Sequence, residues 1–135
     1  MEENDTQDSV IVVVKEKNKL LVIRRSKTDE WMPLHWAYAG GHVQVKETPY
    51  YAAKRELLEE TGLKAKSIEY KGIINGSSHG KVYIYLCDEF EGEIKLNFEH
   101  NEHKWVTYDE IDDLDKKTPK IKMIAATALD IPLGY

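Results

Sequence analysis

Residues 48–62, "TPYYAAKRELLEETG", carry the clearest local signals in the chain. Thr48 is a favourable N-cap, and Pro49 suits the first position of a helix. Gly62 readily takes the left-handed conformation that closes a helix at its C-terminus. These residues predict a helix that starts at Thr48-Pro49 and ends at Gly62.

The glutamates of this helix share one side. On a wheel of 100° per residue, Glu56, Glu59 and Glu60 fall within an arc of about 100°. Like charges this close cost roughly 0.2–0.5 kcal/mol per pair, so stability alone does not favour them. Clustered carboxylates form a hard-oxygen site suited to Mg²⁺ or Mn²⁺, while a plain solvated helix face is the alternative. Ala52 falls in the same arc, where its small side chain would let a loop or ligand approach.

The opposite side of the predicted helix is apolar and is expected to pack on a sheet. Its residues are Tyr50, Tyr51, Ala53, Leu57 and Leu58. Arg55 stands beside Glu56 and four residues before Glu59, where it can orient one carboxylate without neutralising all three.

The rest of the chain predicts an α+β fold, in which a mixed sheet packs against two helices. A hairpin with its turn at Lys17-Asn18 precedes a polar loop and a strand with an irregularity at Gly40-Gly41. A second helix is expected to start at Thr118-Pro119. One domain is expected over residues 1–135, with residues 1–8 flexible. The later strands are expected at residues 67–74, 81–90, 93–98 and 103–108.

Composition narrows the class of protein. With 41% hydrophobic and 32% charged residues among 135, the chain is typical of a soluble protein. The net charge of −5 argues against general binding to nucleic acid polymers. Cys87 is the only cysteine, which excludes an intrachain disulfide and indicates a buried, inert thiol. Without a signal peptide or membrane-length apolar run, a cytoplasmic monomer or homodimer is expected.

Residues 41–63, "GHVQVKETPYYAAKRELLEETGL", are similar, position for position, to the signature of the Nudix hydrolase family. The flanking segments "LLVIRR" and "DEIDDL" also resemble those of small Nudix hydrolases. Ala39 departs from the pattern, since the family usually has Pro before the paired glycines. The matching residues are Gly41, Glu47, Arg55, Glu56, Leu57, Glu59, Glu60, Gly62 and Leu63.

The resemblance implies a Nudix fold, an α/β/α sandwich whose signature forms a loop–helix–loop. It also implies Mg²⁺-dependent hydrolysis of a nucleoside diphosphate linked to another group. Carried over by position, Glu59 and Glu60 would be the principal metal ligands. Glu56 would be a further ligand or the general base, and Arg55 would orient it.

Several further residues are candidates through the same resemblance. Glu47 would be another ligand or a partner between loop and helix, and the carbonyl of Gly40 or Gly41 could face a metal. The family often adds an acid from a later loop. Glu99, six residues before Trp105, is the first candidate and Glu102 the second.

Several residues outside this helix are candidates for contact with the substrate. Arg24 and Arg25 could bind phosphates, whereas Lys27 suits an ordinary solvated position. Trp31 lies in a polar loop and is a candidate for contact with the base, as His42 is for contact with a phosphate. Core packing is expected for Trp36 and Trp105, and solvent-exposed loop positions are expected for His100 and His103.

The family's secondary signals for ADP-ribose, dinucleoside polyphosphate, NADH and coenzyme A hydrolases are absent. Elimination favours a MutT-like enzyme that converts a (d)NTP to a nucleoside monophosphate and pyrophosphate. ADP-ribose or a nucleoside diphosphate sugar remains an alternative substrate. A non-catalytic nucleotide sensor is the alternative of another class, although such domains usually lack some of the carboxylates.

Overall fold

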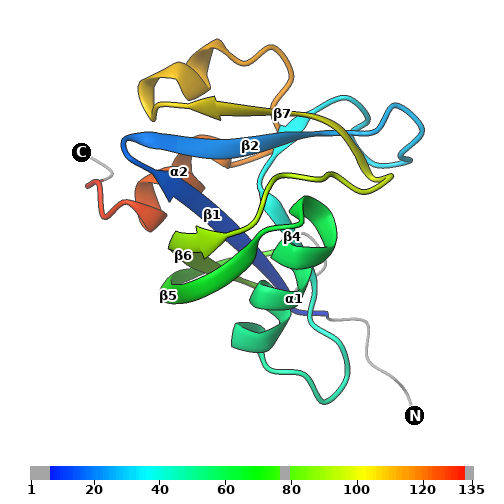
Figure 1. Ribbon diagram of the computed structural model, residues 1–135, viewed down its shortest axis with the longest axis vertical. Helices are drawn as coiled ribbons and strands as arrows, with labels where there is room; N and C mark the ends of the chain where they lie inside the picture. The colour runs from blue at the N-terminus through cyan, green and yellow to red at the C-terminus, as the bar shows by residue number, and fades with distance from the viewer. Residues whose placement is uncertain (1–6, 77–79, 133–135) are drawn as a thin grey trace.

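The computed structural model describes residues 7–76 and 80–132 of the chain (Figure 1). These residues form seven strands, two α-helices and one short 3₁₀ helix. The strands are β1 (Ser9–Glu16), β2 (Lys19–Arg25), β3 (Trp36–Ala37), β4 (Ala39–His42), β5 (Lys64–Asn75), β6 (Lys81–Glu91) and β7 (His100–Val106). The helices are α1 (Pro49–Thr61), η1 (Asp109–Asp113) and α2 (Ile121–Ala128).

The seven strands form one mixed sheet, as expected. Its main order is β3-β2-β1-β6-β5, with β4 paired to β1 and β7 paired to β2. Among the strands of the described residues, β1 and β6 pair in parallel and the other pairs are antiparallel. The first half of β1 pairs with β4 and its end pairs with β2, so β1 joins the two parts of the sheet.

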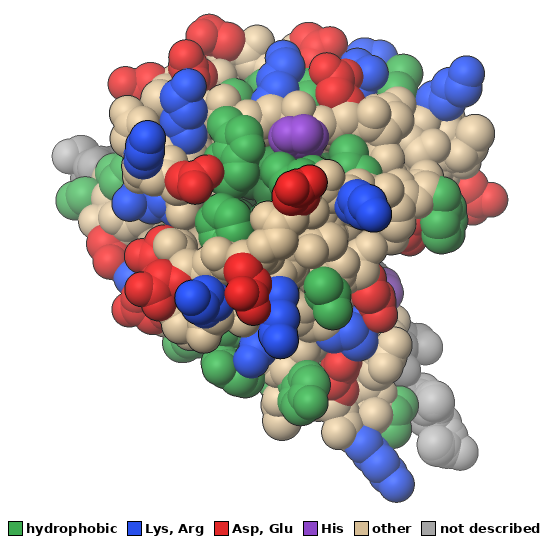
Figure 2. All heavy atoms as spheres, viewed as in Figure 1, with side chains coloured by type: hydrophobic (Ala, Val, Ile, Leu, Met, Phe, Trp, Pro, Cys, Tyr) green, Lys and Arg blue, Asp and Glu red, His purple; other side chains and the backbone are tan. Residues whose placement is uncertain are grey.

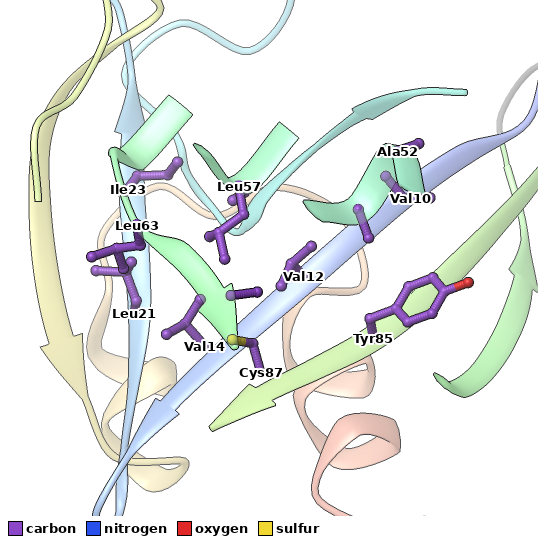
Figure 3. Close-up of a cluster of buried hydrophobic side chains, with 13 residues drawn as sticks. Val10, Val12, Val14, Leu21, Ile23, Ala52, Leu57, Leu63, Tyr85 and Cys87 are labelled. Atoms are coloured by element: carbon purple, nitrogen blue, oxygen red, sulfur yellow. The ribbon is translucent and has the colours of Figure 1, made fainter. Parts of the chain in front are cut away.

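Alternation along β1 builds a core on each face of the sheet. Val10, Val12 and Val14 lie in the cluster that α1 covers (Figure 3). Val13 points the other way, into the cluster that α2 covers. Successive side chains of a strand point to opposite faces, so a continuous apolar run fills both cores. The helices on both faces give the α/β/α arrangement.

The ends of α1 are those that the sequence predicts. Thr48 Oγ1 accepts a hydrogen bond from the backbone N–H of Tyr51 at 3.2 Å. Gly62 has a φ of 79°, and its N–H donates to the carbonyl of Leu58. Local capping chemistry therefore fixes the length of this helix.

The face on which α1 packs differs from the predicted one. Tyr50, Tyr51 and Leu58 are exposed, and with Lys54 and Lys64 they line a shallow hollow outside the helix. The buried residues of α1 are Ala52, Ala53, Leu57, Glu60 and Thr61. Ala53 and Leu57 pack inward as predicted, but the separation of apolar and acidic sides is incomplete, because packing on β4, β1 and β5 also turns Glu60 inward.

The strand irregularity lies at Tyr38, not at Gly40-Gly41. Here the chain leaves β2, with which β3 pairs, and joins β1, with which β4 pairs. Tyr38 is buried, and its hydroxyl donates to the carbonyl of Ile121 at 2.7 Å. The change of pairing partner therefore causes the break.

Two other elements differ from the sequence prediction. Residues 93–98 are not a strand; the backbone N–H of Lys95 instead donates to the carbonyl of Thr61. The second helix starts at Ile121, after Lys120 in a left-handed conformation. Thr118 does not cap that helix, because its N–H and hydroxyl both donate to the carbonyl of Trp36.

Most of the predicted flexible segment, residues 1–6, lies outside the described residues. Asp8 is fixed, contrary to the prediction, because its carbonyl accepts from Val43 N–H and its carboxylate accepts from Lys81 N–H. No helix among residues 7–76 and 80–132 is long and apolar enough to cross a bilayer.

The three residues that the sequence places in the core are buried or half-buried. Cys87 is buried, and burial raises its pKa to about 11, which is consistent with an inert thiol. Trp36 is buried, while Trp105 is half-buried and stacks on Phe90.

His100 is not the exposed loop residue that the sequence predicts. It begins β7 with only 6% of its surface exposed, and its Nδ1 has no hydrogen-bond partner among residues 7–76 and 80–132. Burial, together with the charge of Arg25, lowers the pKa of His100 to about 4. His103, on the same strand, is exposed as expected.

The buried histidine predicts a pH-dependent stability. The folded pKa lies below the ordinary 6.5, so between those values the unfolded chain binds more protons and stability falls as the pH falls. In His100→Leu this loss, at most about 3 kcal/mol, should disappear. Chemical denaturation from pH 7 to pH 4 measures it. His103→Gln is the matched control and should keep the wild-type slope; equal slopes in all three proteins would contradict the expectation.

Candidate active site

The three glutamates of α1 lie at different depths. Glu60 is buried, and its Oε1 accepts a hydrogen bond from the backbone N–H of Gly40 at 3.0 Å. The Glu56 side chain is largely covered, whereas that of Glu59 is 54% exposed. The carboxylates therefore extend from the contact between α1 and β4 out to the surface.

Arg55 connects this helix to the loop that precedes it. Its Nε and Nη2 donate to the two oxygens of Glu47 at 2.6 and 2.9 Å. Its Nη1 donates to Glu56 and Glu59, at 3.1 and 3.2 Å, and its Nη2 also donates to the carbonyl of His42. One guanidinium thus orients three carboxylates and a strand end.

The contacts with Arg55 and the burial of side chains shift the pKa values of the glutamates in opposite directions. The hydrogen bonds from Arg55 lower the pKa of Glu47 to about 2, and those to Glu47 raise the pKa of Arg55. Burial raises the pKa of Glu60 to about 8, although the Gly40 N–H opposes that shift. Burial also raises the pKa of Glu56, against the attraction of Arg55.

At Gly40 and Gly41 of β4, neighbouring atoms occupy the space that a Cβ would need. A Cβ on Gly41 would lie 2.2 Å from a carboxylate oxygen of Glu56, so the carboxylate occupies the place of a side chain. A Cβ on Gly40 would lie 2.3 Å from the backbone carbonyl of Val10. Gly41 thus admits a functional side chain, and Gly40 admits the neighbouring strand.

Glu99 belongs to the loop between β6 and β7 and is brought near this cluster. Beyond burial, the negative charge of Glu99 helps to raise the pKa of both Glu56 and Glu60. Its backbone carbonyl accepts from Ser26 N–H at 2.9 Å. Glu102 lies farther along β7, where it pairs with Arg24 at 2.8 Å.

The chemistry of this donor set fits a divalent cation. Glu56, Glu60 and Glu99 repel one another, and their oxygens are the ligands that hard cations prefer. Across the described ranges 7–76 and 80–132, no three His, Cys, Asp or Glu side chains are already arranged to hold one ion. Arg55 donates to one oxygen each of Glu56 and Glu59, and the Gly40 N–H donates to one oxygen of Glu60.

The predicted phosphate contacts already have protein partners. Arg24 donates to Asn101 and pairs with Glu102, and Arg25 pairs with Asp29 at 2.6 Å. His42 ends β4, and its Nδ1 lies 3.2 Å from the hydroxyl of Ser9. The structure therefore brings the helix glutamates, Arg55, Glu47 and Glu99 together, but it leaves neither arginine free.

Sequence reasoning missed two residues beside the site. Asp29 lies four residues after Arg25, a spacing that could have suggested the ion pair. No local signal could have placed His100 in the interior, because its burial follows from the pairing of β7 with the end of β2.

Comparisons with known proteins identify the family of this chain. A family model described as NUDIX domain matches residues 5–127. A MutT-like protein of Streptomyces ambofaciens is 29% identical over 85% of this chain and 72% of its own length. An 8-oxo-dGTP diphosphatase of Buchnera aphidicola is also 29% identical, over 85% of this chain and 88% of its own length.

Solved structures show the same fold. A MutT NUDIX hydrolase from Burkholderia pseudomallei superposes with a TM-score of 0.80 at 19% identity, covering 92% of this chain and 98% of its own. A MutT protein from Methanosarcina mazei Go1 gives 0.75 at 24% identity, covering 92% and 93%. This chain belongs to the Nudix family. It is a hydrolase of the class that acts on phosphorus-containing anhydrides, whose members generally use divalent cations.

Substitution of the two glycines should have different effects. Gly40→Ala places a methyl group against the backbone of β1 and should lower the free energy of unfolding by about 1–3 kcal/mol. In Gly41→Ala the nearest atoms to the new methyl group belong to the end of the flexible Glu56 side chain, so stability should stay near wild type and turnover should fall. Denaturation and nucleotide hydrolysis measure the two effects, and equal behaviour of both variants would contradict this reading.

Arg55→Lys should release the loop of residues 43–48. A lysine keeps the charge but cannot donate to both oxygens of Glu47 while reaching Glu56, Glu59 and the His42 carbonyl. Hydrogen exchange of the loop amides should become faster in the variant. The amides of β6, remote from Arg55, are the internal reference, and unchanged exchange in the loop would refute this role of Arg55.

Proposed function

We propose that this protein is a MutT-like pyrophosphohydrolase that converts a (d)NTP to a nucleoside monophosphate and pyrophosphate. The observation that carries the proposal is the acidic cluster of α1, in which Arg55 orients carboxylates beside a buried Glu60. An oxidised guanine nucleotide is the first substrate to test, because the Buchnera aphidicola relative is an 8-oxo-dGTP diphosphatase.

In this proposal Glu59, Glu60 and Glu56, with a carbonyl of Gly40 or Gly41, would hold Mg²⁺, or Mn²⁺ in its place. The bound cation would polarise phosphoryl oxygens and lower the pKa of the attacking water. The Gly40 N–H directs one oxygen of Glu60, which leaves the other for a ligand. Glu47 fits the role of loop-to-helix partner better than that of ligand, because Arg55 engages both of its oxygens.

The reaction would begin with attack of water on one phosphorus of the triphosphate. The phosphoanhydride bond breaks, and the oxygen that bridged two phosphorus atoms leaves with one of the products. Glu99 suits the general base, because it is exposed at the edge of the cluster and, within the described residues, its carboxylate accepts only a long hydrogen bond, 3.4 Å, from the side-chain amide of Asn97. Glu56 is the alternative base, and burial raises its pKa, although its contact with Arg55 opposes that shift.

The charges on the protein surface suit a small nucleotide substrate better than a nucleic acid polymer. Acidic and basic side chains alternate over the face in Figure 2, with no broad basic surface on that side. A cytoplasmic monomer or homodimer is part of the same proposal. ADP-ribose or a nucleoside diphosphate sugar is the second candidate substrate, and a nucleotide sensor is the candidate of another class.

Removing one negative charge from the acidic cluster of α1 tests the proposed enzymatic activity. Glu59→Gln should reduce kcat at least about a hundredfold, the scale seen when one electrostatic contact to a reacting group is lost. Stability should change little, because Glu59 is more than half exposed. Chromatography of products formed with Mg²⁺ from 8-oxo-dGTP, canonical (d)NTPs, ADP-ribose and sugar nucleotides measures turnover.

Glu16→Gln is the matched control, since Glu16 is an exposed acid at the end of β1. This variant should retain wild-type turnover. Full activity in Glu59→Gln would overturn the assignment of the site. Cleavage of ADP-ribose or a sugar nucleotide alone would replace the substrate, and tight binding without turnover would favour the sensor.

A further inference from the structure

Trp31 is an exposed aromatic side chain that the protein holds in place. The residue lies in the loop between β2 and β3, with 53% of its surface accessible. Its backbone N–H donates to Asp29 Oδ1 at 3.0 Å, and its carbonyl accepts from Arg25 Nε at 2.9 Å. An exposed tryptophan usually loses freedom when it binds a ligand, and this one is largely fixed beforehand.

Arg25 supplies most of that restraint. Its guanidinium lies 4.8 Å from the centre of the Trp31 ring, within the range of a cation–π contact. The same guanidinium pairs with Asp29 at 2.6 Å, with only about a fifth of each side chain exposed. Arg25 therefore covers one side of the indole and closes the turn that carries it.

The backbone of this loop needs such support. Met32 and Leu34 have φ values of 49° and 63°, in the left-handed region that residues with a Cβ rarely adopt. The Arg25 backbone closes the loop, with its N–H donating to His35 and its carbonyl accepting from Leu34. Side chain and backbone of one residue thus hold both ends of the loop.

The loop lies beside the candidate active site. Ser26 N–H donates to the carbonyl of Glu99 at 2.9 Å, and Arg25 pairs with His100 across β2 and β7. Figure 1 shows the two loops side by side at the same end of these strands. Burial raises the pKa of Glu60, and Arg25 is close enough for its charge to oppose that shift.

This position gives the indole a clear chemical use. A base can stack on an aromatic face, and such stacking tolerates different bases because each has a π-face. The diphosphate of the same nucleotide would lie over the acidic cluster. Phe98, the residue before Glu99, is 87% exposed and offers a second aromatic surface near the same edge.

We propose that Trp31 is the surface on which the nucleobase stacks, and that Arg25 is a positioning residue for Trp31 rather than a phosphate ligand. The proposal rests on the proposed nucleotide hydrolase function. Base recognition then starts from a loop that is already ordered.

Binding of the reaction product tests the stacking without turnover. Calorimetry with 8-oxo-dGMP and dGMP, in the presence of Mg²⁺, should show Trp31→Ala binding about tenfold more weakly than wild type. Trp31→Phe should bind within about threefold of wild type, because it keeps an aromatic face. Nucleotide should quench tryptophan fluorescence in wild type and much less in Trp31→Phe, which assigns the signal to Trp31.

Steady-state kinetics tests the role of Arg25. Arg25→Ala and Arg25→Lys should both raise KM about tenfold and change kcat less than about threefold, because a lysine cannot reproduce the planar stack and the two hydrogen bonds. Both variants should also lose much of the nucleotide-induced quenching. A large fall in kcat with unchanged KM, or full activity in Arg25→Lys, would overturn the positioning role.

Tyr51→Ala is the matched control, since Tyr51 is an exposed aromatic residue on the outer side of α1. It should retain wild-type KM and quenching. Wild-type turnover with unchanged binding in Trp31→Ala would overturn this inference alone. Absence of turnover and of nucleotide binding in the wild-type protein would instead overturn the proposed function.

Discussion

The close contact between α1 and β4 places a carboxylate inside the protein, and the candidate site depends on it. Ala52 and Ala53 are fully buried, so little side-chain volume separates the helix from the sheet. Gly40 supplies an N–H to Glu60, and Gly41 leaves room for the carboxylate of Glu56. With larger residues at these positions, the helix would stand farther from the strand and its glutamates would be solvated.

The arrangement concentrates negative charge where water is partly excluded. Burial disfavours the ionised form of Glu60, and Glu56 and Glu99 add repulsion. The hydrogen bonds of Arg55 to Glu47, Glu56 and Glu59 offset part of this cost. A divalent cation would offset more of it, which connects an unfavourable local arrangement to the chemistry of a phosphoanhydride hydrolase.

The three arginines near the candidate site connect different segments of the protein. Arg55 links the loop after β4 to α1, while Arg24 links β2 to β7 through Glu102 and Asn101. Arg25 organises the turn that presents Trp31. Each guanidinium uses several of its donors within the protein, so these arginines act mainly by fixing the shape around the site.

Sequence alone determined the features that depend on neighbours along the chain. Thr48, Pro49 and Gly62 set the ends of α1, and the spacing of the Nudix signature identified the family and the candidate glutamates. Alternating apolar residues and turn signals also indicated the mixed sheet, because side-chain periodicity is a local property.

Tertiary structure decided what depends on contacts between distant segments. The direction in which α1 turns its side chains, and hence the burial of Glu60, follows from packing against β4 and β1. The break at Tyr38, the interior position of His100 and the approach of Glu99 follow from which strands pair. The burial of a side chain and the interactions between charges depend on segments far apart in sequence, so no local pattern predicts them.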